Sequence, residues 1–362
     1  MNEFTPIVTA YEKLRADRTP LGARFLSGER PYLIFQTPNG DVWSDMRTPE
    51  QSFNENMKLI KTSLETPSDH LPVLEPWFGT GVYANMYGCD YVWRTGEAPA
   101  VHYRYHNIAE VRNVTQPRWQ DSPIAHLVLD AIRYFKQKTG NAIPIIWTDT
   151  QSASDSATMI LDACEVFAAC LQEPDTIMAF MRGINRLIIE FSQVQSDLIG
   201  DAGIHPGHIF LNNSHFQGLS VSDDNIAVGS PAVNRKFNLV LDEEIGKAMG
   251  GVTIHSCGRW MNTMRLVKGL TPSCISIDCA LDKDCDPDPC DPESVRDAMR
   301  GSGIVVCART TGDTGRMLAE VKKLLHPNLK VVIHPAFIDV PTAERNYAEL
   351  EELLSAFYKP GE

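Results

Sequence analysis

The sequence lacks three features that would indicate particular classes of protein. No apolar run approaches the roughly 20 residues that a membrane helix needs, so we expect no membrane protein. No block of Lys and Arg occurs, and the net charge of -13 argues against nucleic acid or an anionic membrane as a partner. The first six residues carry neither the basic nor the apolar part of a secretion signal. We therefore expect a cytoplasmic protein whose nine cysteines, an odd number, are reduced.

Short β-rich runs alternate along the chain with long segments of helical periodicity. The runs are Pro31–Gln36, Leu71–Glu75, Ile143–Trp147, His208–Asn212, Val252–His255, Cys274–Ile277, Ile304–Cys307 and Val331–His334. The helical segments include Ser122–Thr139, Ser154–Leu171, Asp175–Ile199, Pro231–Met249, Pro292–Arg300, Thr314–Leu325 and Thr342–Phe357. Eight strands that alternate with helices predict an α/β fold, a closed (β/α)8 TIM barrel. A doubly wound open sheet is the alternative, although the first strand lacks the Gly-rich turn of its dinucleotide-binding form.

The domain organisation follows from this pattern. Residues 1–362 are expected to form a single domain, with residues 1–30 as a helical lead-in and residues 31–362 as the barrel. Aromatic and polar residues alternate between about residues 91 and 111, which predicts an inserted β-hairpin. Nothing in the sequence indicates an internal repeat or a flexible linker.

In such barrels the chemistry lies at the carboxyl ends of the strands. The predicted strand ends are rich in carboxylates and metal ligands: Gln36, Glu75, Asp149, Asn212, His255 with Cys257, Asp278, Cys307 with Arg309, and His334.

The sharpest local feature is the pair His255 and Cys257 at the end of the fifth predicted strand. A thiolate and an imidazole two residues apart can reach one ion where the strand passes into a loop. A barrel brings strand ends together, so His334 is the predicted third ligand, and Cys307 is held in reserve. Three protein ligands with an open fourth position are typical of catalytic zinc. The alternative for His334 is a packing histidine with a hydrogen bond to a neighbouring loop.

A second group of residues is expected to shape a substrate pocket. Its predicted members are Glu75, Trp77, Asp149, His208 and Asn212. Asp223 is a candidate for proton transfer. Alternatively, Asp223 and Asp224 hold a loop through backbone hydrogen bonds, and the aromatic residues near the strand ends are core packing.

Several motifs resemble those of the uroporphyrinogen decarboxylase superfamily, whose members are (β/α)8 barrels. The resemblance covers nearly the whole chain and is carried by residues 74–81 and 87–89, 173–175, 222–224 with 230–231, and 254–258. True decarboxylases of this superfamily have an Arg-rich segment after the first strand that grips the acidic porphyrinogen. Here Thr37 to Gly40 follow that strand without an arginine, which argues against such a substrate.

The resemblance is therefore closer to the cobalamin-dependent methyltransferase branch, in which a His-x-Cys pair and a later residue hold zinc. His255 and Cys257 match the pair, whereas His334 lies about where this branch usually has a cysteine. The resemblance implies a zinc-dependent methyltransferase that moves a methyl group between a corrinoid and a small molecule, with His255, Cys257 and Asp223 catalytic. It also implies a possible corrinoid protein as partner and a possible homodimer.

Two alternatives stay open. One is a decarboxylase of a tetrapyrrole or a smaller acid, whose cations would come from Arg24, Arg30, Arg104 or Arg309. The other is a non-catalytic corrinoid or tetrapyrrole carrier.

Overall fold

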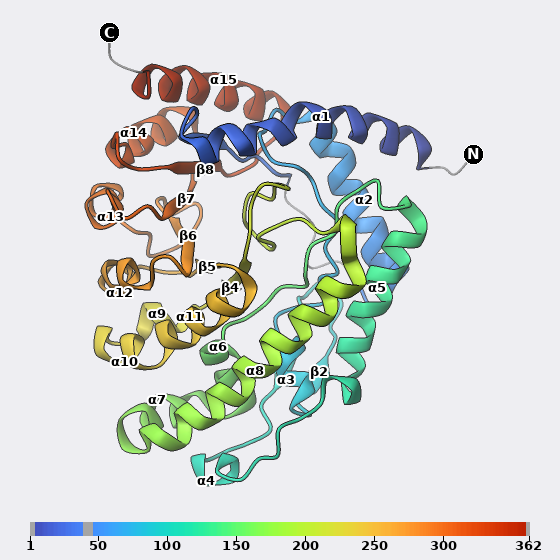
Figure 1. Cartoon of the computed structure of the whole chain (residues 1–362), viewed down its shortest axis with the longest axis vertical. Helices are drawn as coiled ribbons and strands as arrows, with labels where there is room; N and C mark the ends of the chain where they lie inside the picture. Colours follow the sequence, from blue (N-terminus) through green and yellow to red (C-terminus); the bar gives the residue numbers. More distant parts are fainter. Residues whose placement is uncertain (1–3, 39–45, 360–362) are drawn as a thin grey trace.

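The centre of the molecule is a parallel sheet of six strands in the order β1-β8-β7-β6-β5-β4 (Figure 1). The structure, a computed structural model, describes residues 4–38 and 46–359. The strands of this sheet are β1 Tyr32–Ile34, β4 Leu219–Ser222, β5 Val252–His255, β6 Cys274–Ala280, β7 Val305–Thr310 and β8 Val331–Pro335. Strands β4 to β8 are neighbours in chain order, and the last strand pairs in parallel with the first. This order is that of a TIM-barrel-like α/β fold.

The predicted second and third strands are extended segments that make single bridges in place of ladders. Leu74 pairs in parallel with Ile145, and Ile145 also pairs with Gly203. These bridges lie on the path from β1 to β4, where a complete barrel would have two further strands. The ladder of the six-stranded sheet therefore does not itself close within the described residues.

The prediction of a fourth strand at residues 208–212 is wrong, because the fourth strand of the sheet is β4, farther along the chain. Residues 208–212 form a loop in which the Asn212 side chain binds both the amide and the carbonyl of Gly207, at 2.7 and 3.0 Å. Ile209 has a φ of 69°, which no strand residue adopts. Phe210 and Leu211 are nevertheless buried against the inner face of the sheet. The apolar run at residues 208–212 does contain core residues. Hydrophobic periodicity, however, cannot distinguish a short buried loop from a buried strand.

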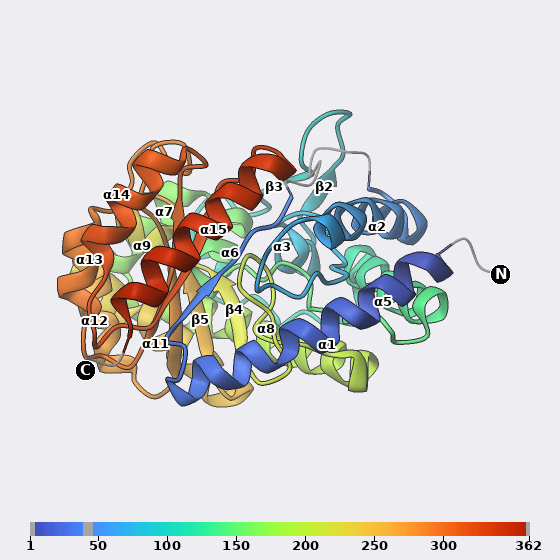
Figure 2. The same ribbon diagram turned by 90° about the horizontal axis from the view of Figure 1, so that it is seen from above.

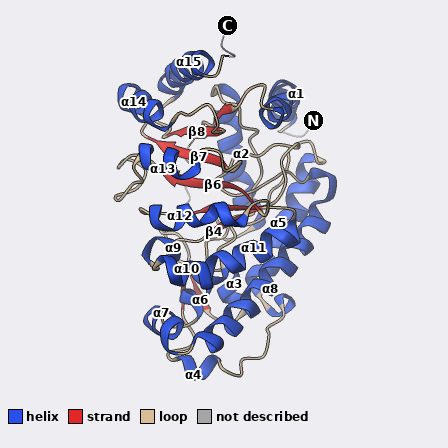
Figure 3. Cartoon of the chain, turned by 60° about the vertical axis from the view of Figure 1, so that its left-hand side comes forward, coloured by secondary structure: helices blue, strands red, loops and turns tan. Residues whose placement is uncertain are grey.

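The α-helices alternate with the strands as the sequence predicts. They are α1 Thr5–Ser27, α2 Pro49–Glu65, α3 Val82–Met86, α4 Ile108–Val111, α5 Pro123–Thr139, α6 Ala153–Ile160, α7 Ala163–Gln172, α8 Pro174–Ile199, α9 Asn225–Val228, α10 Pro231–Lys236, α11 Asn238–Met249, α12 Met261–Val267, α13 Pro292–Met299, α14 Thr314–Leu324 and α15 Val340–Phe357. Figures 1 and 3 show α12, α13, α14 and α15 along the outer face of the sheet. Helices α1 and α15 both contact β1 (Figure 2).

Two predicted helices are each divided into two. The segment predicted at 154–171 breaks at Leu161, whose backbone is extended, and Asp162 then caps α7 through the Cys164 amide. The segment predicted at 231–249 breaks at Phe237. The last helix begins at Val340, two residues before the predicted start, because Asp339 accepts a hydrogen bond from the Thr342 amide.

The lead-in and the hairpin are present with shorter bounds than predicted. Helix α1 accounts for most of the lead-in, although residues 1–3 lie outside the described residues. The hairpin consists of β2 Asp90–Val92 and β3 Ala100–His102, which pair antiparallel in a separate two-stranded sheet. The rest of the predicted insertion is turn and α4. Among the described residues, no helix is both long and apolar enough to cross a membrane.

Candidate metal and substrate site

Four polar side chains meet on the inner face of the sheet, near the carboxyl ends of its strands. The parallel register places His255 opposite Asp278, and Arg309 opposite His334. Residues directly opposite each other in neighbouring strands project to the same face. The regular pairing of β5 to β8 therefore holds these side chains on one face of the sheet, with Arg309 and His334 two residues farther toward the carboxyl ends than His255 and Asp278.

His255 is oriented by Asp278 so that its second ring nitrogen is left for another partner. The Nδ1 atom of His255 lies 2.6 Å from Oδ1 of Asp278, and the Nε2 atom lies 3.6 Å from Sγ of Cys257. Arg309 donates from Nε to the same Asp278 oxygen at 2.8 Å. Burial raises the pKa of Asp278, but Arg309 and His255 outweigh it, and the pKa is lowered overall. A carboxylate behind a histidine is a recurrent support of metal-binding imidazoles.

The third potential ligand beside this pair is Asp224. His255, Cys257 and Asp224 form the one group of three or more potential ligands within residues 4–38 and 46–359 whose donor atoms all lie within 4.8 Å of one another. Oδ1 of Asp224 is 4.0 Å from Nε2 of His255 and accepts a hydrogen bond from the Cys257 amide at 2.7 Å. Asp155 holds Asp224 in place by accepting from its backbone amide at 2.7 Å.

The separation of the His255 and Cys257 ligand atoms fits a zinc ion. Tetrahedral zinc with bonds of about 2.3 Å to sulfur and 2.0 Å to nitrogen places those two atoms about 3.5 Å apart. The measured 3.6 Å between His255 and Cys257 agrees with this value. Burial and Asp224 raise the pKa of Cys257 to about 12, so the thiol stays protonated until a cation binds beside it.

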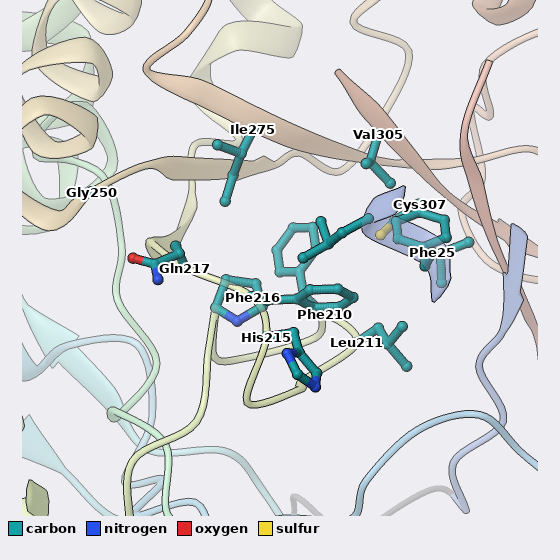
Figure 4. Close-up of a pocket in the computed structure, with 13 residues that line it drawn as sticks. Phe25, Phe210, Leu211, His215, Phe216, Gln217, Gly250, Ile275, Val305 and Cys307 are labelled. Carbon is teal, nitrogen blue, oxygen red and sulfur yellow. The ribbon is translucent and has the colours of Figure 1, made fainter. Parts of the chain in front are cut away.

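The predicted third ligand, His334, and the reserve ligand, Cys307, lie outside this group. The His334 ring stacks on Phe35 at a centroid distance of 4.2 Å, and burial lowers its pKa to about 4. Cys307 faces an apolar cavity of about 270 Å³ toward the amino ends of the strands, together with Phe25 and Phe210 (Figure 4). Burial raises the pKa of the Cys307 thiol, as expected in apolar surroundings.

A second cavity, of about 350 Å³, contains most of the predicted substrate group. Glu75, His208, Asn212 and His334 are among the residues that line it. Nδ1 of His208 lies 2.6 Å from Oε1 of Glu75, and Nε2 of His208 lies 3.8 Å from Oδ2 of Asp149. Burial lowers the pKa of His208, but Glu75 and Asp149 outweigh it and raise the value to about 9. His208 is therefore protonated at neutral pH.

Trp77 and Asn212 have supporting positions around this cavity. Trp77 donates from Nε1 to Oδ2 of Asp149 at 3.3 Å. Asn212 uses its side chain within the loop that carries His208, where it binds Gly207 and the carbonyl of Phe210. The structure thus brings Glu75, Trp77, Asp149 and His208 together, with Asn212 at the cavity wall.

Asp223 is fully buried behind Asp224. Its Oδ1 accepts a hydrogen bond from the Ser152 hydroxyl at 3.0 Å, and its backbone amide donates to the carbonyl of His255. Burial and the neighbouring Asp242 raise the pKa of Asp223. The acidic residue that lies beside His255 and Cys257 is Asp224, the residue after the predicted Asp223.

Three residues at the site were not among the predicted metal ligands or pocket residues, although Arg309 was a candidate cation of the alternative decarboxylase and Asp224 a candidate loop residue. Asp278 and Arg309 are both among the predicted strand ends. Arg309 is two residues after Cys307 in β7, a spacing that places both side chains on the same face of the sheet. Asp224 had no separate signal, because two adjacent aspartates cannot be ranked without knowing how the chain turns after β4.

The fold and these polar side chains define a TIM-barrel-like protein with a candidate site at the carboxyl ends of its strands. Residues 77–295, more than half of the chain, match the family model described as uroporphyrinogen decarboxylase (URO-D). The chain therefore belongs to the uroporphyrinogen decarboxylase family. A comparison with curated proteins returned no match.

One solved structure confirms the fold, and a second match is weaker. A methyltransferase from Methanosarcina mazei aligns with a TM-score of 0.59 and 14% identity, over 84% of this chain and 86% of that chain. A putative dehydratase from Mesorhizobium loti aligns with a TM-score of 0.40 and 9% identity, over 86% of this chain and 56% of that chain.

Proposed function

We propose that this protein is a zinc-dependent methyltransferase that moves a methyl group between a corrinoid and a small molecule. The observation that carries the proposal is the geometry of His255 and Cys257, whose ligand atoms lie 3.6 Å apart while Asp278 holds the far side of the imidazole. His255, Cys257 and Asp224 would hold the metal. Zinc at this position would lower the pKa of an acceptor thiol and present it as a thiolate.

The residues of this chain would supply orientation and a closed environment. Asp278 keeps Nε2 of His255 directed at Cys257, and Arg309 in turn fixes Asp278. The cavity beside them offers protonated His208 and the carboxylates Glu75 and Asp149 for the small molecule. During transfer to a thiol, a sulfur–carbon bond forms and the bond from that carbon to the corrinoid breaks, leaving its electron pair on the corrinoid. The thiol proton would pass to solvent, and Asp224, whose side chain is exposed, could relay it.

The arrangement of arginines supports this proposal over porphyrinogen decarboxylation. Arg24 pairs with Glu29 at the surface, and buried Arg30 is paired with Asp69 and Glu351. Arg104 donates to the carbonyl of Tyr87. Of the four arginines proposed as cations for a decarboxylase, Arg309 alone lies among the inward-facing side chains of the site. One cation is a poor match for a porphyrinogen with eight carboxylates.

Metal analysis of the purified protein tests the first step. We expect about one zinc per chain, as in a mononuclear site, and loss of that zinc in Cys257→Ala. Cys164→Ala is the matched control, because Cys164 is an exposed cysteine on α7 far along the chain from the group. Absence of zinc from the wild-type protein, or its retention in Cys257→Ala, would contradict the proposed metal site.

Incubation with methylcobalamin and a thiol tests the reaction itself. We expect the absorption of methylcobalamin to change as a methylated thiol accumulates, in the wild-type protein and in Cys164→Ala but not in Cys257→Ala. Binding of methylcobalamin without methyl transfer would favour a carrier. Decarboxylation of uroporphyrinogen, without methyl transfer, would favour the reaction for which the family is named.

A further inference from the structure

We propose that Arg309 and His334 form a binding subsite for a carboxylate group of the substrate, next to the candidate metal ligands. The role assigned to this subsite rests on the proposed function: it would hold the anionic end of a small acceptor whose reactive atom faces Cys257 and His255. The binding site itself is argued from the contacts of this chain alone.

Two buried polar atoms carry the inference. Nη2 of Arg309 and Nδ1 of His334 are shielded from solvent and have no hydrogen-bond partner among the described residues. A buried polar group without a partner costs about 1–3 kcal/mol, and more for a charged group. Such groups are rare in folded proteins and indicate a missing partner. Here two of them occur on residues that face each other across neighbouring strands.

The two side chains are held ready for a ligand by their other contacts. Arg309 and His334 are direct register partners in β7 and β8, so both project inward at the same level. Arg309 is anchored through Nε to Asp278 at 2.8 Å, which leaves Nη2 unpaired. The His334 ring is fixed by stacking on Phe35. The two donors are therefore already oriented before a ligand binds. Binding then costs less conformational entropy, because the side chains do not have to be ordered.

The chemistry of the donors favours a carboxylate. The guanidinium is a permanent cation, and His334 is neutral, so one ring N–H can donate without adding a second charge. One carboxylate oxygen would accept from Arg309 and the other from His334, in the manner of charge-assisted pairs. A phosphate carries more charge than this single cation can balance, since Asp278 already offsets part of it.

The cavity limits the size of the ligand. His334 lines the cavity of about 350 Å³, whose other walls include the apolar side chains of Phe35, Ile60, Val73 and Ile146. Its polar wall includes Glu75 and His208 in addition to His334. A short carbon skeleton could lie against the apolar walls while its carboxylate lies at His334, whose register partner is Arg309.

Calorimetric titration of the wild-type protein with propionate and with its neutral isostere propionamide tests the subsite. We expect propionate to bind at least about tenfold more tightly than propionamide, a difference of about 1.4 kcal/mol. Equal affinity, or no saturable binding of propionate, would overturn the inference. Tighter binding of inorganic phosphate than of propionate would overturn the assignment to a carboxylate.

Variants locate the binding. Arg309→Gln and, separately, His334→Leu are expected to weaken propionate binding at least about tenfold. Arg316→Gln removes an exposed arginine that pairs with Asp282 and Asp284, and it should bind propionate as the wild type does. Circular dichroism establishes that each variant is folded. Unchanged affinity in a folded Arg309→Gln variant would contradict the subsite, as would unchanged affinity in His334→Leu.

The titration is carried out on both chelator-treated and zinc-loaded protein, which separates the two proposals. Propionate binding by a protein that takes up no zinc would refute the proposed metal site and retain the subsite. A protein that binds zinc and transfers methyl groups but shows no preference for propionate would refute the subsite alone.

Discussion

The two halves of the barrel-like sheet differ in how their site residues are positioned. From β4 to β8, continuous parallel ladders place His255, Asp278, Arg309 and His334 on one face of the sheet. From β1 to β4, single bridges and a buried loop replace ladders, and His208 reaches Glu75 from that loop. The comparison teaches that strand register positions His255 and its support Asp278, whereas loops position Cys257, Asp224 and the residues of the neighbouring cavity.

The largest expected effect on stability comes from the part between β1 and β4, where single bridges and a buried loop replace ladders. Phe210→Ala removes a fully buried ring that lines both cavities, so we expect the free energy of unfolding to fall by about 3–5 kcal/mol. Denaturant unfolding measures this change. Phe167→Ala, at an exposed position on α7, should change the free energy by no more than about 0.5 kcal/mol. Similar losses in the two variants would mean that the loop is not part of the packed core.

His208 provides a pH-dependent test of the same half. Its folded pKa of about 9 lies above the unfolded value of 6.5. The stabilisation from its protonated form is therefore complete below about pH 6.5 and is lost as the pH rises through about 9. We expect a loss on the order of 3 kcal/mol, measured as the free energy of unfolding at each pH.

The His208→Asn variant should show a flatter dependence on pH over the same interval. His106→Asn, at an exposed position, should keep the dependence of the wild type. A wild-type profile with no decline between these pH values would show that Glu75 and Asp149 do not hold a proton on His208.

The smallest expected effect tests the regular half. Asp278→Asn leaves the ligands in place but weakens the support of the His255 imidazole, so zinc affinity should fall by about 10- to 100-fold. Competition with a chromophoric chelator measures the affinity. Asp288→Asn removes the same charge at an exposed position that pairs with Arg259 and should leave the affinity unchanged. An unchanged affinity in Asp278→Asn would mean that Asp278 does not support His255 as a metal ligand.

Sequence patterns predicted β5 to β8 of the regular half well. The first strand and the last four strands are observed, and the His255 and Cys257 side chains lie close together as expected from their spacing. Four of the five predicted pocket residues also meet, since strand ends converge in this fold. The fourth strand was misplaced because an apolar run predicts burial but does not specify how its backbone is paired.

The sequence by itself determined the fold class, the family and the residue types available for chemistry, because hydrophobic periodicity and local motifs are encoded over short stretches of chain. Only the tertiary structure decided that Asp224 lies beside His255 and Cys257 while Asp223 is buried behind it. It likewise placed Arg309 beside His334 with unpaired nitrogens. The physical reason is that distances between groups far apart in sequence depend on strand register and on how each loop packs, and neither is a property of one segment alone.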